Sequence, residues 1–291
     1  MNTRSSHSIA LSGASGFVGT WLRTSFEQHG WSVQPLGRND FQMSAEELAE
    51  KMGDADVVVN LAGAPIISRW TDEYKKTLYD SRIKVTKALV EACAKMQTKP
   101  AAFISASAVG YYAAGGPYTE TKHKKDSGFL GRLAQDWEEE ARKAETMGIR
   151  TVIFRFGVVL GRGGGALQQM LTPFRLGLGG IIGDGSQPFS WIHIRDLEHA
   201  YETVIDDETY SGIYNLTTPE ATTNKGLTEA LGKALGRPTL LQVPNFVLRL
   251  RFGDGAQVLS SGQAVIPERL LERGFTFQFT DIEKALRDCL S

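Results

Sequence analysis

Three glycines near the N-terminus, Gly13, Gly16 and Gly19, stand three residues apart. They follow a short apolar run and open a stretch with the apolar periodicity of a helix. Glycines in this place allow a tight turn, close approach of the backbone to a pyrophosphate, and close packing of helix against strand. The helix N-terminus then offers free N–H groups and the positive end of its dipole to the phosphates. The pattern predicts a dinucleotide-binding loop.

The glycine spacing alone carries little weight, because glycine makes up 31 of the 291 residues. Gly177, Gly180 and Gly183 repeat the same spacing, but no predicted strand precedes them. We therefore predict a loop there and assign the nucleotide to the first motif, whose position between a strand and a helix fits the chemistry.

The end of the second predicted strand, Leu36-Gly37-Arg38-Asn39-Asp40, selects the cofactor. Chains that bind NAD usually carry an acidic residue there, which accepts a hydrogen bond from the ribose 2′-hydroxyl. The guanidinium of Arg38 instead suits a 2′-phosphate, through charge-assisted hydrogen bonds. Asp40 competes for a ribose contact but lies two residues further on, where a new strand could begin. A solvated surface role for Arg38 stays open, and the sequence favours NADP(H) over NAD(H).

The elements that must position these residues alternate through the first half of the chain. Strands are predicted at 8–11, 31–36, 55–61, 102–105 and 151–156, and helices at 17–29, 45–52, 72–96 and 129–147. This alternation predicts an α/β fold with a Rossmann-type doubly wound parallel sheet. On the last of these helices, Trp137 is predicted in the core and the run 138–140 on the solvated face.

The rhythm changes after residue 157, where the glycine-dense stretches 161–165 and 177–185 follow. Further strands are predicted at 191–194 and 212–216, and helices at 196–204, 224–235 and 281–290. We predict an NADP-binding Rossmann domain over 1–165, to whose sheet later segments could return. A smaller substrate-facing α/β part is predicted over 166–291, including the C-terminal segment 244–291.

Composition narrows the classes of function. Lys plus Arg total 32 and Asp plus Glu total 33, so the net charge of −1 lacks the basic excess that drives nucleic-acid binding. Cys93 and Cys289 cannot form a disulfide framework, which fits a reducing compartment. No zinc-ligand, P-loop or nucleophile-elbow spacing occurs, so we predict no metal, P-loop or hydrolase site.

Two stretches of the sequence are candidates for a signal peptide and for a membrane span, and neither has the expected pattern. The stretch MNTRSSHS has a single Arg and only a short apolar run after it, which is not a signal peptide. The uncharged stretch 100–119 is interrupted by serines and glycines, so it predicts a strand and a loop rather than a membrane span. We expect a cytoplasmic protein with neither a nucleic-acid nor a membrane partner.

Four later segments fall in an order that is informative together with the glycine loop. They are Asn60-Leu61-Ala62-Gly63, SASAVGYY from Ser105, RFGVVLG from Arg155 and FSWIHIRD from Phe189. This order resembles that of the extended short-chain dehydrogenase/reductases. The segment 244–290, with LSSGQ from Leu259 and PERLLERGF from Pro267, resembles the C-terminal domain of unknown function of one subgroup, the "epimerase family proteins". These are labelled nucleoside-diphosphate-sugar epimerase-like, and the resemblance covers nearly the whole chain.

The resemblance implies a set of site residues. Contacts with NADP(H) are implied at Gly13, Ser15, Gly16, Phe17, Val18, Gly19, Arg38, Leu61, Ala62, Gly63, Arg82, Ser105, Ala106, Arg155 and Phe156. Substrate contacts are expected at Tyr112, Trp191 and His193, although a structural role for His193 is the alternative.

The catalytic residues depart from the pattern of active relatives. Those relatives use a Ser and then Tyr-xxx-Lys on a helix, where Tyr transfers the proton and Lys lowers its pKa and holds the ribose. Ser107 fits the Ser position, but the Tyr and Lys positions on the helix 129–139 hold Leu130 and Ala134. Arg82 stands where active relatives usually carry Asn, and it could orient a phosphate or carboxylate or form a salt bridge on the helix surface.

Three tyrosines are candidates for a replacement acid. Tyr111 and Tyr112 follow Ser107 on the loop after its strand, and we place Ser107 and Tyr111 in the catalytic set. Packing of the substrate pocket is the alternative for both tyrosines. Tyr118 and Lys122 form a literal Tyr-xxx-Lys, but they stand in what the sequence predicts to be an exposed loop rather than on the helix.

Two functions from different classes follow. One is an NADP(H)-dependent oxidoreductase or epimerase with a non-standard proton donor, acting on an unidentified small molecule. A nucleotide-sugar epimerase or dehydratase is a narrower form of this hypothesis, carried by the family label alone. The other is a binding protein that senses NADPH and has lost its chemistry. A homodimer is a possible assembly for either.

Overall fold

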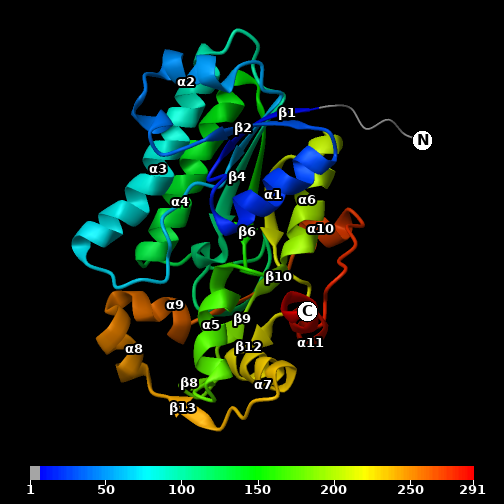
Figure 1. Cartoon of the computed structure of the whole chain (residues 1–291). Coiled ribbons are helices and arrows are strands. Elements are labelled where there is room, and N and C mark those ends of the chain that lie inside the picture. The colour runs from blue at the N-terminus through cyan, green and yellow to red at the C-terminus, as the bar shows by residue number, and fades with distance from the viewer. Residues whose placement is uncertain (1–6) are drawn as a thin grey trace.

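The computed structural model describes residues 7–291 and has a six-stranded sheet at its centre (Figure 1). The strand order is β11-β6-β4-β3-β1-β2, and every pairing is parallel. The strands are β1 Ser8–Ser12, β2 Ser32–Leu36, β3 Val57–Asn60, β4 Ala102–Ala108, β6 Arg150–Phe156 and β11 Gly212–Leu216. This confirms the predicted doubly wound α/β sheet. The stretch MNTRSS, for which no signal peptide is predicted, lies outside the described residues.

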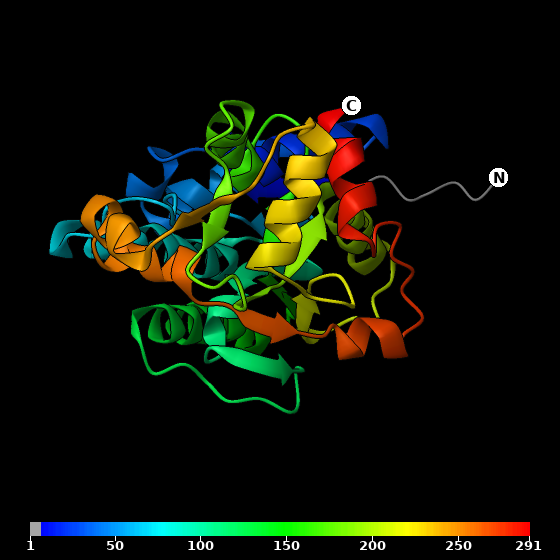
Figure 2. The same cartoon turned by 90° about the horizontal axis from the view of Figure 1, so that it is seen from below.

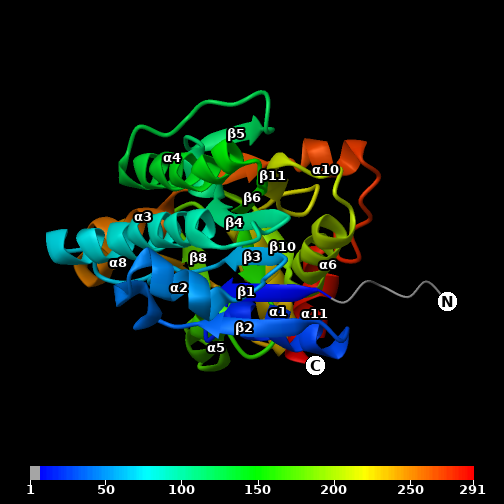
Figure 3. The same ribbon diagram turned by 90° about the horizontal axis from the view of Figure 1, so that it is seen from above.

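Helices cover both faces of the sheet (Figure 3). On one face lie α1 Phe17–Gln28 and α6 Ile194–Asp206, and on the other α2 Ala45–Met52, α3 Asp72–Lys95 and α4 Phe129–Arg142. Each helix turns an apolar stripe towards the strands, which are buried on both faces and therefore rich in apolar residues. The sheet is held between two apolar cores.

A smaller lobe lies beyond the carboxyl ends of the strands, since β6 leads directly into it (Figure 1). Its elements are β7 Val158–Leu160, α5 Gly165–Arg175, β8 Gly180–Ile182, β9 Pro188–Phe189, β10 Trp191–His193, β12 Thr222–Thr223, α7 Asn224–Leu235, β13 Leu241–Val243, α8 Asn245–Phe252, α9 Gln257–Ser260 and α11 Ile282–Leu290. Helix α10 Glu268–Glu272 packs against β11 of the large sheet instead. The strands of the lobe pair two by two, as β10-β7, β12-β9 and β13-β8. The lobe has its own apolar core, formed mainly by α5, α7 and α11.

The C-terminal segment returns from this lobe to the sheet. Strand β14 Gln263–Val265 pairs in parallel with β5 Gly115–Tyr118, across about half the length of the chain. In Figure 2 the orange β14 lies beside the blue-green β5, close to α10. The segment 244–291 therefore does not form a separate unit.

Several expectations need correction. The stretch 177–185 is not only a loop, because it contains β8, which pairs with β13. Asp40 begins a 3₁₀ turn, Asp40–Gln42, rather than a strand. Strand β4 continues to Ala108, three residues beyond its predicted end. The return of β11 to the sheet needs no correction, because later segments are expected to return to it.

No helix among residues 7–291 combines the length and the apolar character that a membrane span needs.

Candidate functional site

The glycine loop between β1 and α1 is shaped by close contacts. Gly13 has φ +70°, and a Cβ there would lie 2.8 Å from the carbonyl carbon of Leu61. A Cβ at Gly19 would lie 2.1 Å from the carbonyl oxygen of Gly13. A backbone conformation with positive φ favours glycine, and so does a contact that leaves no room for a side chain. The loop therefore fits the predicted phosphate-binding turn, in which the backbone itself meets the ligand.

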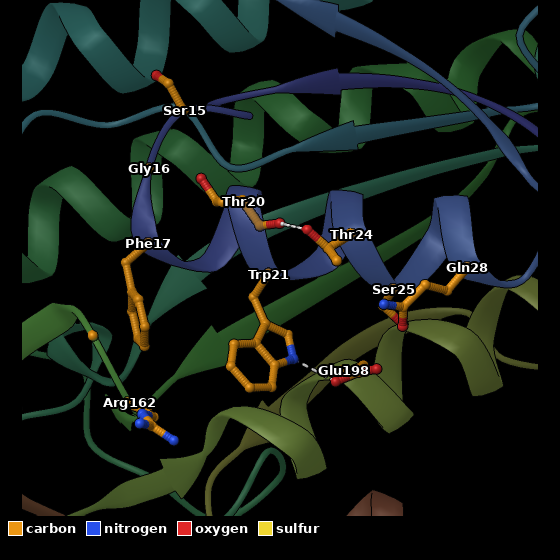
Figure 4. A pocket seen from close by; sticks show the side chains of 11 residues that line it. Ser15, Gly16, Phe17, Thr20, Trp21, Thr24, Ser25, Gln28, Arg162 and Glu198 are labelled. Atoms are coloured by element: carbon orange, nitrogen blue, oxygen red, sulfur yellow. Dashed lines mark hydrogen bonds between the residues drawn. The ribbon is translucent and has the colours of Figure 1, made fainter. Parts of the chain in front are cut away.

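The N-terminus of α1 is open. No side chain caps it at Gly16, and no acidic residue stands in its first turn. A cavity of about 600 Å³ begins at Ser15, Gly16 and Phe17 and continues along α1 to Trp21 and Glu198 (Figure 4). Free N–H groups at an uncapped helix N-terminus bind anions, because their dipoles point outward. The geometry can therefore receive a phosphate.

A buried polar network holds the strand ends beside this loop. Ser12 Oγ donates to Asn60 Oδ1 at 2.8 Å and accepts from the backbone N–H of Leu61 at 3.1 Å. Asn60 Nδ2 donates to Thr86 Oγ1 at 2.8 Å and to Ser105 Oγ at 3.3 Å. Side chains from β1, β3, β4 and α3 thus fix one another. Ser105, which the resemblance places at the cofactor, is fully buried in this network, and its neighbour Ala106 is buried in β4.

Asp40 and Arg38 differ in what they contact. Asp40 is buried and accepts from Lys51 Nζ at 2.6 Å and from the N–H of Gly37 at 2.6 Å. The hydrogen bond from Lys51 lowers the pKa of Asp40, so the carboxylate stays charged and engaged. Arg38 is exposed, and none of the residues 7–291 forms an ion pair with it. Of the two, only Arg38 is free to meet a ligand.

A buried ion pair lies beneath the carboxyl end of β4. Arg155 of β6 and Glu138 of α4 are joined by two hydrogen bonds, Nε to Oε1 at 2.6 Å and Nη2 to Oε2 at 2.7 Å. Ser107 Oγ donates to the same Oε1 at 2.8 Å. All three are at most 4% exposed. Burial alone would lower the pKa of Arg155, but the bonds to Glu138 raise it above its ordinary value.

Aromatic rings and an amide complete this cluster. Arg155 Nη1 donates to the Tyr112 hydroxyl at 2.7 Å, and that hydroxyl donates to Asn215 Oδ1 at 2.6 Å. The ring of Tyr111 stacks on the guanidinium of Arg155, with 3.4 Å from Cζ to the ring centroid. Within residues 7–291 the Tyr111 hydroxyl makes no hydrogen bond, whereas that of Tyr112 is fully engaged. Arg155 is therefore a structural centre and not a surface open to a cofactor.

In the literal Tyr-xxx-Lys, Tyr118 contacts this cluster, whereas Lys122 is exposed. Tyr118 ends β5 and stacks on Tyr112 at 5.7 Å with an angle of 18° between the rings, so it is not in an exposed loop. Lys122 is exposed, as expected for the basic run that follows. Between the two, Glu120 Oε1 accepts from the N–H of Asn215 at 2.8 Å. The segment supports the cluster from outside.

Two residues predicted to contact substrate are fully buried in the lobe. Trp191 packs with the apolar core of the lobe. His193 stacks on Phe279 at 3.8 Å, and its Nδ1 accepts from the N–H of Arg195 at the start of α6. Burial lowers the pKa of His193 to about 4, so the ring is neutral at neutral pH. Their contact with substrate stays a prediction, and we do not include them in the site proposed below.

Sequence reasoning missed Glu138, which was predicted on a solvated face. Leu130, Leu133, Ala134, Trp137 and Ala141 form the apolar stripe of α4. Position 138 follows Ala134 by four residues, so the helical period places it on that stripe. A charged residue on the buried stripe needs a partner of opposite charge, and this signal could have indicated Arg155.

Comparison with known proteins identifies the family. The model of the NAD dependent epimerase/dehydratase family matches residues 9–217, and that of a domain of unknown function (DUF1731) matches residues 243–289. The chain belongs to the NAD-dependent epimerase/dehydratase family. Epimerase family protein SDR39U1 of Mus musculus is 37% identical over 97% of this chain and 99% of its own. Epimerase family protein SSP1921 of Staphylococcus saprophyticus is 36% identical over 96% and 97%.

Solved structures of this family agree with the fold. Human epimerase family protein SDR39U1, crystallised with NADPH, has a TM-score of 0.89 and 34% identity, covering 97% of this chain and 98% of its own. A nucleoside-diphosphate sugar epimerase of Corynebacterium glutamicum has a TM-score of 0.80 and 31% identity, but this chain spans only 58% of it. UDP-glucose 4-epimerase of Thermus thermophilus, at 16% identity and a TM-score of 0.78, shows the likeness of fold alone.

Leu130 and Ala134, which we predict at the positions of the Tyr and Lys of active relatives, lie in apolar surroundings. Leu130 packs in an apolar cluster with Trp70, Leu78 and Leu133, and a Cβ at Gly110 would lie 3.5 Å from its Cβ. Ala134 is buried against tyrosines of the loop after β4. Neither side chain can transfer a proton or hydrogen-bond a ribose. Any acid must therefore come from elsewhere.

Proposed function

We propose that this epimerase-family protein binds NADP(H) and transfers a hydride between it and a small carbonyl or hydroxyl compound, using a proton donor outside the Tyr-xxx-Lys helix. The observation that carries the choice of cofactor is the difference between Arg38 and Asp40. The carboxylate of Asp40, after the end of β2, is held by Lys51 and a backbone N–H, while the guanidinium of Arg38 forms no ion pair with any of residues 7–291. The NADPH bound to the human relative supports the same choice.

The residues present fit such a cofactor. The contacts at Gly13 and Gly19 leave room for backbone only, and the open N-terminus of α1 offers N–H groups to a diphosphate. Arg38 would take the 2′-phosphate, and the loop Leu61-Ala62-Gly63 would lie along the nucleotide. When bound, NADPH supplies the hydride. The Arg155 cluster keeps the ends of β4 and β6 in place beneath this region.

Among the groups near the end of β4, Tyr111 is the best candidate for the proton donor. Ser107 donates to Glu138 and is shielded from any ligand, and the Tyr112 hydroxyl is engaged by Arg155 and Asn215. Tyr111 keeps its hydroxyl without a protein partner in the described chain, and its ring is fixed on Arg155. A free hydroxyl on a fixed ring can donate to a substrate oxygen.

The cofactor is tested by calorimetric titration of wild type and Arg38→Ala with NADPH and NADH. We expect wild type to prefer NADPH and the variant to lose most of that preference, because one charge-assisted contact is worth about 1.5–3 kcal/mol, or roughly tenfold or more in affinity. Arg237→Ala is the matched control, since it removes an exposed arginine just after α7 in the smaller lobe and should leave the preference unchanged. Equal affinities for the two cofactors in wild type would overturn the assignment.

The chemistry is tested by single-turnover oxidation of NADPH with a panel of aldehydes and ketones. Tyr111→Phe should lower the rate by about 10²–10⁴-fold if its hydroxyl is the acid. Tyr118→Phe is the control, because it keeps the ring that stacks on Tyr112 and should leave the rate within about twofold of wild type. A rate unchanged in Tyr111→Phe would remove that residue from the mechanism.

A second function has one observation in its favour. Because Leu130 and Ala134 fill the catalytic positions with apolar groups, the fold could bind NADPH without reacting, as a sensor of the cofactor. Tight binding of NADPH with no oxidation across the panel would support this function over the first.

A further inference from the structure

Arg82 of α3 is a cation held among apolar groups. Its Nη1 donates to the carbonyl of Leu78 at 3.1 Å and its Nη2 to that of Ala64 at 3.1 Å. The guanidinium lies 5.3 Å from the ring centroid of Trp137. A Cβ at Gly63 would stand 3.0 Å from its Cζ, so the guanidinium packs directly on the backbone of the loop after β3.

No carboxylate neutralises this charge. Among residues 7–291, none forms an ion pair with Arg82, and burial lowers its pKa to about 10. The nearest acidic residue on the same helix, Asp80, is bound by Lys76 at 2.5 Å and by Lys84 at 2.9 Å on the solvent side. Partly shielding a cation from water without a counter-charge is unfavourable, and a folded chain tolerates it where the charge is needed.

Arg155 shows what a purely structural arginine looks like in this fold. Arg155 is more deeply buried than the partly exposed Arg82, and Glu138 meets it with both carboxylate oxygens while the Tyr112 hydroxyl accepts another of its N–H groups. Arg82 uses two of its five N–H groups on backbone carbonyls, which leaves three without a partner of the described chain. The remaining donors suit an oxyanion, which binds a guanidinium through two parallel hydrogen bonds.

The position of Arg82 brings it to the edge of the proposed cofactor site. Its neighbour Gly63 belongs to the loop that continues from Leu61, and Leu61 meets the glycine loop at Gly13. On the other side, the apolar seam between α3 and α4 includes Leu78, Leu133 and Leu130, the last in the position of the missing catalytic tyrosine. The guanidinium therefore lies between the loop after β3 and the apolar residues of α3 and α4, and a ligand that binds there would meet its charge.

We propose that Arg82 is the anchor for an oxyanion, a carboxylate or phosphate carried by a ligand of this site. This inference rests on the proposed function for the place of the site. The oxyanion has two sources, a phosphate of the cofactor or an acidic group of the substrate beside the apolar seam. Arg82 then provides a fixed polar contact beside the apolar cluster of α3 and α4, and small-molecule sites commonly combine such groups.

The test uses Arg82→Met, which keeps the length of the side chain and removes the charge. We expect Arg82→Met to melt at the same temperature as wild type or higher, since an unneutralised cation has been replaced by an apolar chain. Inorganic phosphate and benzoate, each added to the apo protein and to protein saturated with NADPH, should raise the melting temperature of wild type more than that of Arg82→Met, in which only the glycine loop and Arg38 remain to bind an anion. Lys84→Met is the matched control on the solvent side of α3 and should respond as wild type does.

The two sources of the oxyanion separate in the cofactor titration. If Arg82 binds a cofactor phosphate, Arg82→Met weakens NADPH about tenfold or more, and saturating NADPH abolishes the phosphate response of wild type. If it binds the substrate, NADPH affinity stays within about twofold of wild type and the anion response persists with NADPH bound. Arg82→Lys, which keeps charge but loses the planar fork, should retain part of the response.

A clear result overturns the proposal. If Arg82→Met melts well below wild type while NADPH affinity and the anion responses are unchanged, Arg82 is a structural residue like Arg155. If wild type responds to neither anion, with or without NADPH, and the variant binds NADPH normally, no oxyanion is held there. Failure of wild type to bind NADPH would instead refute the proposed function, while the difference in anion response between apo wild type and apo Arg82→Met still tests Arg82.

Discussion

Glu138→Gln should destabilise the fold far more than a surface substitution. The change keeps the shape of the side chain but removes the charge that neutralises Arg155, which is only 2% exposed. It also disturbs three hydrogen bonds, from Ser107 and from two nitrogens of Arg155. Breaking one partner of a buried pair costs about 3–5 kcal/mol, because the other charge is left without compensation. For a chain of this size we expect the melting temperature to fall by roughly 10 °C.

The measurement is urea unfolding and thermal melting of wild type, Glu138→Gln and Glu139→Gln. Glu139 is the next residue on α4 and is exposed, so its variant should differ from wild type by less than about 0.5 kcal/mol. The double variant Glu138→Gln with Arg155→Met should recover part of the loss, because the unpaired cation is gone. A loss below about 1 kcal/mol for Glu138→Gln, or equal losses at 138 and 139, would refute the reasoning.

Three further outcomes are expected. Gly19→Ala should abolish detectable NADPH binding, because its Cβ would stand 2.1 Å from the carbonyl oxygen of Gly13; calorimetry checks this, with Gly30→Ala as a control for a strained glycine replacement outside the loop, since Gly30 has φ +79° but nothing lies within 4 Å of its Cβ position. Lys122→Ala should leave both melting temperature and turnover unchanged, since its side chain is exposed; a fall in turnover alone would make the loop motif catalytic. Burial lowers the pKa of His193 from 6.5 to about 4. Between these pH values His193 is therefore protonated in the unfolded chain but neutral in the folded protein. Stability should therefore fall by up to about 3 kcal/mol between pH 6.5 and 4, and less in His193→Gln; identical urea midpoints against pH in both would contradict it.

Local pattern was enough to predict much of the fold. The β-branched run of β3 and the glycine loop before α1 each lie within a dozen residues, and their positions agree with the structure. Other elements of the fold depend on tertiary packing between segments that are distant in sequence. The second glycine repeat contains β8 only because β13 lies beside it, more than 50 residues later in the chain, and no local signal indicates that partner.

The candidate site divides in the same way. Arg38 could be identified from its place at the end of a strand, but that Asp40 is occupied follows from Lys51, on the next helix. The role of Ser107 depends on Glu138, and that of Tyr112 depends on Asn215, 103 residues away. A sequence shows which residues can do chemistry, whereas the partner that engages each of them is set by the tertiary fold.

The pairing of β14 with β5 makes the order of synthesis matter. Tyr118 accepts from the N–H of Ile266, and Asn215 Nδ2 donates to the carbonyl of the same residue. The hydroxyl of Ser190 accepts from the N–H of Val265. Until residues 263–266 have been synthesised, the cluster of Tyr111 and Tyr112 lacks its contact with Val265. Contacts between residues this distant in sequence also form slowly. A chain that lacks β14 can form its first strands yet stay unfinished around Tyr112, so completion of the site depends on residues 263–266.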